Sequence, residues 1–326
     1  MRLSRRKLLS RSLMAMSVAS LSPAKRPQRD RRTIALTFDD VPRDRGAFFS
    51  TTERTERLIA TLRAEGVEQA AFFSVPGFIA EPGKGNGAAH IEAYAAAGHV
   101  IANHTWDHRR LSDISADKFV ESIAQAESWL KGKTGYRPWF RFPYLDQAYF
   151  QPAKCRKVSA YLRKVELADA WVTVDGLDWA IEARTLMAVQ RHERIDLSAL
   201  RASYVSTMVH AAEFYDRLAV SLIGRSPAHV ILLHEADVTT LFLRDLVHAL
   251  RSRGWAIVTA DEAYTDPLYQ ALPLGPAMDL CGGQLDPLHC SSMAPTGEPL
   301  SNAPTVFELM AWVAGRQGTI RYSGTL

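Results

Sequence analysis

Short apolar runs alternate with amphipathic stretches along most of the chain. Within the runs, apolar residues follow one another instead of alternating with polar ones, which is typical of strands that are buried on both faces of a parallel sheet. The runs predict about seven strands. They lie at residues 33–38, 69–75, 100–102, 139–142, 170–174, 229–233 and 255–258.

The stretches between these runs carry apolar residues three or four positions apart, which predicts helices. Gly66, Gly98 and Gly132 follow three of them, as is common where a helix ends. The longest stretch has one apolar stripe. This stripe consists of Leu200, Tyr204, Met208, Ala211, Tyr215, Leu218 and Leu222. The predicted helices cover residues 52–65, 90–97, 116–131, 152–164, 199–222 and 240–253.

This alternation indicates about seven βα units and therefore an α/β fold. A barrel of seven or eight strands accommodates the count, and a doubly wound open sheet is the alternative. In a barrel of this kind the chemistry lies at the carboxyl ends of the strands. We expect the barrel to span residues 33–266.

Residues 267–326 differ from the rest because proline punctuates them and glycine is frequent. We expect an extension that wraps on the barrel, with one short helix at residues 306–314 and a loose end. The prolines are Pro267, Pro273, Pro276, Pro287, Pro295, Pro299 and Pro304.

Basic residues are concentrated at the start of the chain. Residues 1–32 hold ten Lys and Arg and one acidic residue, whereas acidic residues outnumber basic ones in the remainder despite the net charge of +4. We expect residues 1–24 to be a signal peptide similar to twin-arginine export signals and residues 25–32 to be a basic linker. A disordered basic arm is the alternative. The body lacks the basic patch of a nucleic-acid-binding protein, and no stable membrane span is expected.

Three cysteines are too few for a disulfide framework. Cys281 and Cys290 either pair or remain free thiols, and with His289 they would form a poor zinc site because a fourth ligand is missing. Cys155 lies in a predicted helix, where packing is its expected role.

Candidate metal ligands follow the first and third predicted strands. Asp39 and Asp40 end the first strand, and two adjacent carboxylates can divide their work, one on a cation and one as a free base. A bare Asp pair also occurs in solvated turns and helix caps. His104 and His108 are four residues apart and can bind one ion, although such pairs also occur as surface or core histidines. One carboxylate and two imidazoles would leave coordination positions open for catalysis.

Further candidates follow later strands. Arg141, in Phe140-Arg141-Phe142-Pro143-Tyr144, could form a two-pronged pair with a carboxylate, or only a structural ion pair. His234 ends an apolar run, where a core histidine is the default. A carboxylate from Asp175 or Asp178 could hold its imidazole and raise its pKa. Asn103 and Asp107 are candidate partners of the metal-binding imidazoles.

In order and spacing, these motifs resemble those of the polysaccharide deacetylase (NodB-homology) family over residues 33–262. The resemblance implies a distorted (β/α)7 TIM-like barrel, and hydrolysis of acetyl groups on sugars with zinc or another divalent ion. By position it implies Asp40, His104 and His108 as metal ligands and Asp39 as the base. It implies Arg141 as the residue that steadies this base, His234 as the acid and Asp178 as its partner. The Tyr144 N–H resembles the oxyanion donor, and Leu232 resembles a wall of the acetyl pocket.

The chain departs from the common family pattern at several positions. Val41 and Leu145 stand where glycine is common, and Phe142 stands where proline is common. Trp179 is one candidate for stacking on a sugar, for which Trp106, Trp139, Tyr144 and Trp171 are others, with buried packing as the alternative. The segment between Trp179 and His229 is longer than the plain barrel requires and is expected to form one side of the cleft.

The expected substrate is an N-acetylated glycan, which would be peptidoglycan, a chitooligosaccharide or a matrix polysaccharide. The same residues would serve an O-acetyl esterase or a small-molecule amidase. A non-enzymatic glycan-binding barrel is a third hypothesis, which the complete set of base, acid and metal ligands disfavours.

Overall fold

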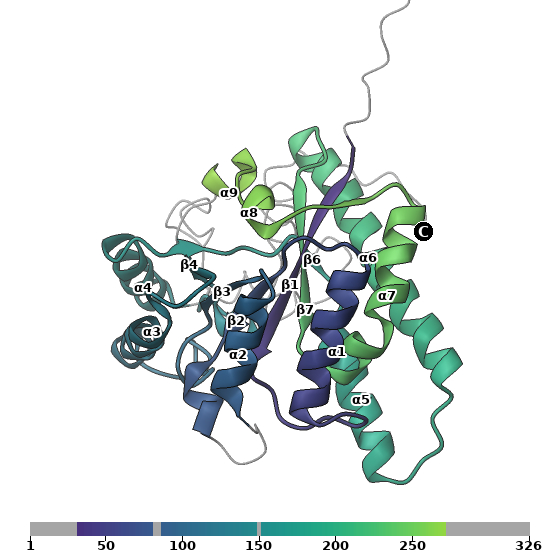
Figure 1. The fold of residues 1–326 in the computed structure, drawn as a ribbon. Coiled ribbons are helices and arrows are strands. Elements are labelled where there is room, and N and C mark those ends of the chain that lie inside the picture. The colour runs from purple at the N-terminus through teal and green to yellow at the C-terminus, as the bar shows by residue number, and fades with distance from the viewer. Residues whose placement is uncertain (1–30, 81–85, 149–150, 272–326) are drawn as a thin grey trace, which may run out of the picture. The chain divides into compact units, whose positions relative to one another are not determined.

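The structure is a computed structural model that describes residues 31–80, 86–148 and 151–271 (Figure 1). These residues belong to one compact unit that begins at Arg31. The predicted signal peptide, the Cys281–Cys290 pair and the helix expected at residues 306–314 lie outside them.

The fold is α/β and is built on one parallel sheet, as the sequence predicted. Hydrogen-bonded neighbours run in the order β5-β4-β3-β2-β1-β7-β6, and β8 pairs with β1. The path is curled and open, a half-barrel instead of a closed cylinder. The strands are β1 (Thr33–Val41), β2 (Ala71–Ser74), β3 (Val100–Asn103), β4 (Tyr136–Phe140), β5 (Ala168–Asp169), β6 (Val174–Asp175), β7 (Ala228–His234) and β8 (Ala256–Ile257).

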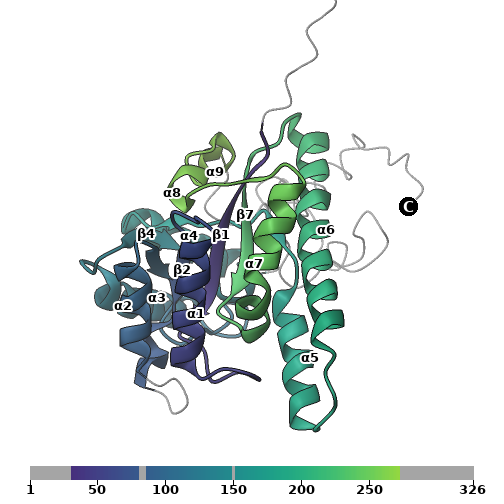
Figure 2. The ribbon, with the colours of Figure 1, turned by 45° about the vertical axis from the view of Figure 1, so that its right-hand side comes forward.

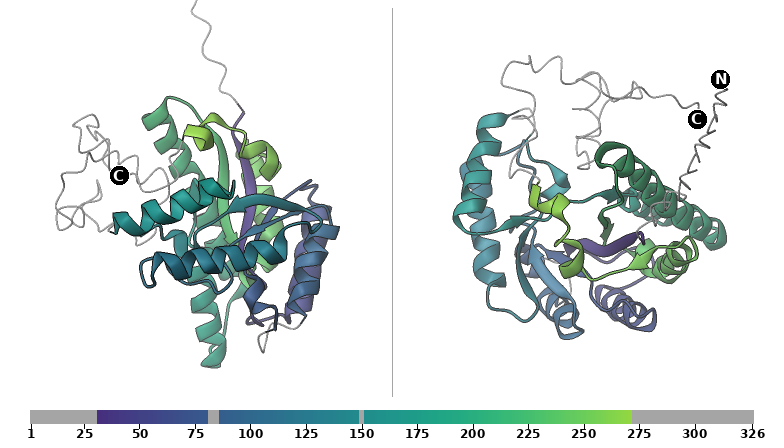
Figure 3. Two further views of the ribbon diagram at one scale, coloured as in Figure 1. Left: turned by 90° about the vertical axis from the view of Figure 1, so that its left-hand side faces the viewer. Right: turned by 90° about the horizontal axis from the view of Figure 1, so that it is seen from above.

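Helices surround the strands when the sheet is seen from above (Figure 3). Ser50 begins the first helix with a capping box, and Gly224 ends the longest one in a left-handed conformation with φ 76°. The helices are α1 (Thr51–Ala64), α2 (Gly87–Ala96), α3 (Ala116–Leu130), α4 (Pro152–Lys164), α5 (Asp178–Gln190), α6 (Leu197–Ile223), α7 (Asp237–Ser252), α8 (Ala260–Ala263) and α9 (Pro267–Ala271).

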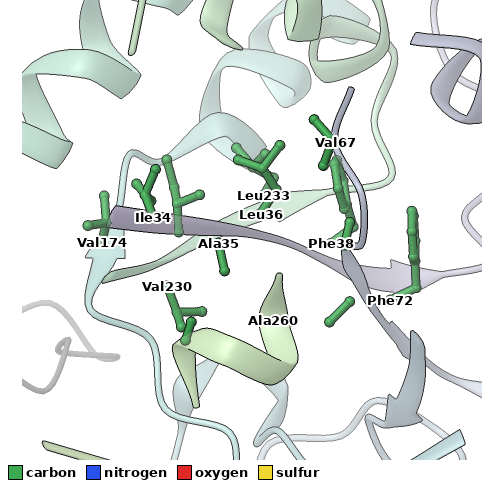
Figure 4. Close-up of a cluster of buried hydrophobic side chains, with 14 of the residues drawn as sticks. Ile34, Ala35, Leu36, Phe38, Val67, Phe72, Val174, Val230, Leu233 and Ala260 are labelled. Carbon is green, nitrogen blue, oxygen red and sulfur yellow. The ribbon is translucent and has the colours of Figure 1, made fainter. Parts of the chain in front are cut away.

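The core is centred on β1 and β7, which pair along their whole length from Thr33 with Ala228 to Asp39 with His234. Ile34, Ala35 and Leu36 are all fully buried, although neighbours in a strand point to opposite faces (Figure 4). Helices therefore cover both faces of β1, which explains why its apolar run is continuous.

The predicted strand at residues 170–174 is wrong in its extent. The chain there forms two short strands, β5 against β4 and β6 against β7. The residues between them are buried and cross from one end of the open sheet to the other. Ala170 N donates to Phe140 O at 2.7 Å on one side, and Thr173 N donates to Val230 O at 3.1 Å on the other.

The long insertion between Trp179 and His229 forms two helices, of which the sequence predicted only the second. Figure 2 shows α5 and α6 as an antiparallel pair. The lower end of this pair extends past the carboxyl ends of β1 and β7. Tyr204, Met208 and Tyr215 of the predicted stripe on α6 are buried against the core. None of the helices in the described part of the chain has the length and apolar character needed to cross a membrane.

Candidate metal centre

The candidate residues gather at the carboxyl edge of the sheet because the strands are parallel. Asp39 of β1 lies opposite His234 of β7 in the strand register. His104 follows the last residue of β3, and Arg141 follows the last residue of β4. Four segments far apart in the sequence therefore place polar side chains at one edge.

Asp40, His104 and His108 converge, with one ligand atom from each lying within 4.8 Å of the others. His108 Nε2 lies 2.8 Å from Asp40 Oδ1, and His104 Nε2 lies 3.5 Å from the same oxygen. Burial opposes ionisation of Asp40, but the neighbouring His108 and His104 hold the pKa of this carboxyl well below its usual range.

The arrangement of these atoms fits a divalent cation. His104 Nδ1 lies 2.8 Å from the carbonyl oxygen of Arg141, and because a carbonyl can only accept, Nδ1 carries the proton. The Nε2 lone pair of His104 therefore faces Asp40. Asp40 Oδ1 is buried without a hydrogen-bond partner. Two imidazoles and one carboxylate are a ligand set for zinc and similar ions that leaves positions open for water and substrate.

Strained backbone holds the ligands in place. Asp40, Thr105 and His108 have positive φ angles of 66°, 66° and 51°, a region that residues other than glycine adopt mainly at turns and functional sites. The turn is fixed locally, because Asn103 Oδ1 accepts from Thr105 N at 2.9 Å and Thr105 Oγ1 accepts from His108 N at 3.0 Å.

The expected imidazole partners therefore have other roles. Asn103 holds the backbone of the turn, and its amide nitrogen donates to Ile123 O. Asp107 accepts from Ser122 Oγ at 2.5 Å. The outer partner of His104 is instead a backbone carbonyl, which sequence patterns cannot reveal.

Asp39 is paired with Arg141 and lies next to the candidate metal ligands. Arg141 Nη1 donates to Asp39 Oδ1 at 2.6 Å, and Asp39 Oδ2 lies 3.7 Å from His104 Nε2. Arg141 is 1% exposed and Asp39 is 3% exposed. A buried ion pair of this kind holds the carboxylate in one orientation beside the cluster.

The sequence missed three partners of Arg141. Its guanidinium also donates to Thr37 Oγ1 at 2.9 Å, to Ala170 O at 3.0 Å and to Tyr264 OH at 2.8 Å. Thr37 precedes Asp39 by two residues and so shares its face of the strand, a signal that was available. Tyr264 lies beyond the last strand, and no local pattern links it to Arg141.

His234 is held by Asp178 through both its ring and its backbone. His234 Nδ1 lies 2.7 Å from Asp178 Oδ1, and His234 N donates to Asp178 Oδ2 at 2.7 Å. Burial by itself would lower the pKa of His234, but the charge of Asp178, its hydrogen bond to the ring and the charge of Asp40 together outweigh burial and raise this pKa to about 9. The imidazole is therefore protonated at neutral pH and can donate from Nε2. Asp175, the other candidate carboxylate, instead accepts from Leu177 N.

Replacing Asp178 with asparagine should move the alkaline limb of the kcat/KM profile to lower pH. The proton on His234 is retained until pH rises through its raised pKa, and the neutral amide removes the charge that raises it. A profile of the hydrolysis that the sequence predicts, measured between pH 5 and 10, tests this, with Asp175→Asn as the matched control. An unchanged alkaline limb in Asp178→Asn contradicts the assigned pair.

Aromatic side chains are exposed on two sides of the candidate site. Tyr144 is 45% exposed and Trp179 is 48% exposed, whereas Trp171 is 7% exposed. The Tyr144 ring lies 4.6 Å from the His108 ring, and the Arg110 guanidinium lies over it at 3.9 Å. Leu232 is buried, at 4% exposure.

Leu145 adopts φ 51°, next to Tyr144 at 58°. A left-handed backbone at this turn explains why glycine is common here in the family that the sequence resembles. This chain keeps the conformation with a leucine, at a cost in strain.

A second buried ionic cluster supports the loop after β1, and no sequence pattern predicted it. Arg54 Nη1 pairs with Asp237 Oδ1 at 3.1 Å, and Glu235 Oε1 accepts from Tyr94 OH at 2.7 Å. Asp237 Oδ2 accepts from the backbone N–H groups of Phe48 and Phe49. These charged groups hold a loop that begins directly after Val41, the residue next to Asp40.

Comparisons with known proteins indicate the same family that the sequence resembles. The sequence profile of the polysaccharide deacetylase family matches residues 26–161. The chain is 24% identical over 238 residues to the peptidoglycan-N-acetylglucosamine deacetylase PgdA of Listeria monocytogenes, a match that covers 73% of this chain and 40% of that protein. The chain therefore spans about two fifths of the length of that curated relative.

Two solved structures share the fold at low sequence identity. A peptidoglycan N-acetylglucosamine deacetylase in complex with 4-naphthalen-1-yl-N-oxidanyl-benzamide has a TM-score of 0.50 and 19% identity, covering 73% of this chain and 90% of that one. A CE4 family pseudoenzyme from Bacillus anthracis has a TM-score of 0.50 and 14% identity, covering 72% of this chain and 66% of that one. Because a pseudoenzyme has the same fold, the fold alone does not decide whether this chain is active.

Proposed function

We propose that the chain is a metal-dependent hydrolase that removes N-acetyl groups from a glycan, because residues 26–161 match the polysaccharide deacetylase family. The observation that carries this proposal is the convergence of Asp40, His104 and His108 beside a separate carboxylate, Asp39. We propose zinc as the ion, although other divalent ions suit the same ligands. When bound, the ion supplies Lewis-acid polarisation of a carbonyl and activation of water.

Asp39 is the proposed general base. Its carboxylate lies beside the metal ligands, and Arg141 orients it through a buried ion pair at 2.6 Å. The pair fixes which oxygen of Asp39 faces the attacking water. Asp39 takes one proton from this water while the water oxygen forms a bond to the acetyl carbon.

The remaining residues act on the developing oxyanion and on the leaving nitrogen. The backbone N–H of Tyr144 is the proposed donor to the developing oxyanion, together with the ion. His234, protonated through its pairing with Asp178, gives its proton to the departing nitrogen as the carbon–nitrogen bond breaks. Acetate and a free amine result, and water supplies the added atoms.

The exposed aromatic residues support a sugar as the substrate. Trp179 and Tyr144 each expose about half of their surface beside the candidate site, as a stacking platform requires. We propose Leu232 as one wall of the acetyl pocket. The α5–α6 pair extends past the same edge of the sheet and would form one side of the cleft (Figure 1). The PgdA relative is named for N-acetylglucosamine in peptidoglycan, which makes peptidoglycan the first substrate to test.

We further propose that the protein is exported, with residues 1–24 as a twin-arginine-like signal and residues 25–32 as a linker before the barrel. The periplasm is the proposed destination, where a glycan substrate would be reached. Residues 33–266 are the proposed catalytic domain and residues 267–326 an extension.

Acetate release from a panel of glycans tests the function. The panel holds peptidoglycan, chitooligosaccharides, an N-acetylated matrix polysaccharide, an O-acetylated xylan and small acetamides. We expect release from an N-acetylated glycan, its loss with a chelator and its return on addition of zinc. Release from only the O-acetylated substrate supports an esterase, and release from only small acetamides supports an amidase. Activity that persists in metal-free protein contradicts the proposal.

A further inference from the structure

Arg43 is held at the site by buried charged side chains on both sides of its backbone. Its N–H donates to Glu235 Oε2 at 2.8 Å, and its carbonyl accepts from Arg54 Nη2 at 2.9 Å. Glu235 and Arg54 are each 1% exposed. Hydrogen bonds to buried charged groups are strong, so this cluster fixes the position from which the Arg43 side chain projects.

The Arg43 side chain projects toward the candidate metal ligands. Its Nη1 atom lies 3.3 Å from Asp40 Oδ2, and 29% of the side chain is exposed. Nη1 is buried, yet no hydrogen bond joins it to any residue in the described ranges. Apart from this ion pair with Asp40, the N–H groups of Nη1 make no hydrogen bond among the described residues, so they can donate to an acceptor on a bound substrate.

Charged groups of both signs lie around Arg43, and Glu235 accepts from its backbone N–H. Arg110, over the Tyr144 ring, adds a second guanidinium on the side of His108. The acids that act electrostatically with Arg43 are Asp40 and Glu182. The pKa of His234 is governed by burial and Asp178, and the charge of Arg43 also lowers it. Arg43 therefore lies within electrostatic reach of both the metal side and the acid side of the site.

A bound divalent ion would share the charge of Asp40 and leave Arg43 short of a counter-charge. The cleft would then favour an anion beside the acetamido group. We propose that Arg43 recognises a carboxylate on the substrate, so that the enzyme prefers N-acetylated glycans whose neighbouring sugar is acidic. This proposal rests on the proposed function and assigns its substrate class. The carboxylate belongs either to a lactyl ether, as on muramic acid, or to a uronic acid.

Binding without turnover tests the proposal directly. Three oligosaccharides of equal length are titrated into the zinc-loaded Asp39→Asn variant: an N-acetylglucosamine oligomer, one alternating with N-acetylmuramic acid and one alternating with glucuronic acid. At least one acidic ligand should bind about tenfold more tightly than the neutral one, because one charge-assisted hydrogen bond contributes about this difference in affinity. The acidic ligand that binds identifies the source of the carboxylate.

Arg43→Gln on the same background should abolish this preference, whereas Arg43→Lys should keep part of it. Arg109→Gln, which removes an exposed arginine nearby, is the matched control and should leave the preference unchanged. In the active enzyme, Arg43→Gln should lower the ratio of the kcat/KM value for acidic glycans to that for neutral glycans about tenfold. Its zinc affinity should stay within about threefold of the parent.

Two results would overturn the proposal. If Arg43→Gln weakens zinc binding and lowers activity equally on acidic and neutral glycans, Arg43 only steadies Asp40. If the parent binds all three ligands equally, no carboxylate is recognised. Failure of the proposed function is distinct, because it appears as no acetate release from any N-acetylated glycan by the parent enzyme.

Discussion

Replacing His104 with alanine is expected to abolish zinc binding and acetate release together. His104 supplies one of three converging ligand atoms, and its ring is fixed by the Arg141 carbonyl. Loss of even an outer partner of a ligand typically weakens metal binding about 10- to 100-fold, so loss of the ligand itself should exceed this. Zinc content after dialysis, a zinc titration and the rate of acetate release measure the effect.

The controls separate metal loss from misfolding. His210→Ala removes an exposed histidine on α6 and should keep both zinc and activity. His108→Ala alters a more exposed ligand and should reproduce the loss with less risk to folding. Zinc at about 100 times its Kd should stabilise the parent by about 2.7 kcal/mol and leave both ligand variants unaffected. Full zinc binding by folded His104→Ala protein would contradict the ligand assignment.

Replacing Asp39 with asparagine is expected to keep the metal and remove catalysis. Asp39 lies outside the three-residue cluster, with its Oδ2 atom 3.7 Å from His104 Nε2. Asparagine keeps the shape of the side chain but cannot accept a proton at neutral pH. A general base typically contributes about 10²- to 10⁴-fold, so kcat should fall within this range. Steady-state acetate release and zinc content measured on one preparation test both expectations.

Asp113→Asn, at an exposed position, is the matched control and should retain full activity. Asp39→Asn also leaves the buried Arg141 without its carboxylate, so thermal unfolding must establish that the variant is folded at the assay temperature. Asp39→Asn protein with the parent's kcat would remove Asp39 from the mechanism. Asp39→Asn protein that loses zinc would make Asp39 a ligand instead of a base.

The sequence predicted that the candidate site residues lie at one edge of the sheet, because parallel strands have their carboxyl ends at the same edge. Asp39, His104, Arg141 and His234 were placed at strand ends from apolar runs alone, and the structure brings all four to that edge. The family resemblance and the α/β fold are confirmed. The metal-ligand and catalytic roles stay predictions until the variants are measured.

The helix α5 was missed because it buries polar residues. Its buried positions are Asp178, Glu182 and Thr185, which are spaced as on one helical face, while Trp179 and Met187 are exposed. A search for apolar periodicity finds no stripe in such a segment. Asp178 on this buried polar face contacts His234. The polar face therefore both concealed the helix from a search for apolar periodicity and contributes a residue to the site.

The loop cluster was missed for a different reason. Arg54 lies in α1, about 180 residues from Glu235, which lies between β7 and α7, and from Asp237, which begins α7. No local pattern predicts that a buried arginine in one helix will meet carboxylates so distant in sequence. The cluster became visible only when the packing of α1 against α7 was known, and it is what fixes Arg43 beside Asp40.

Diffraction from zinc-loaded crystals at the zinc absorption edge tests the central claim most directly. The account predicts one anomalous peak per chain at the carboxyl edge of β1 and β3. It should lie about 2.0–2.2 Å from an Asp40 oxygen and from one nitrogen each of His104 and His108, with the Asp39 carboxylate close by and uncoordinated. Zinc bound through other side chains, or these three groups left apart in zinc-saturated crystals, would contradict it.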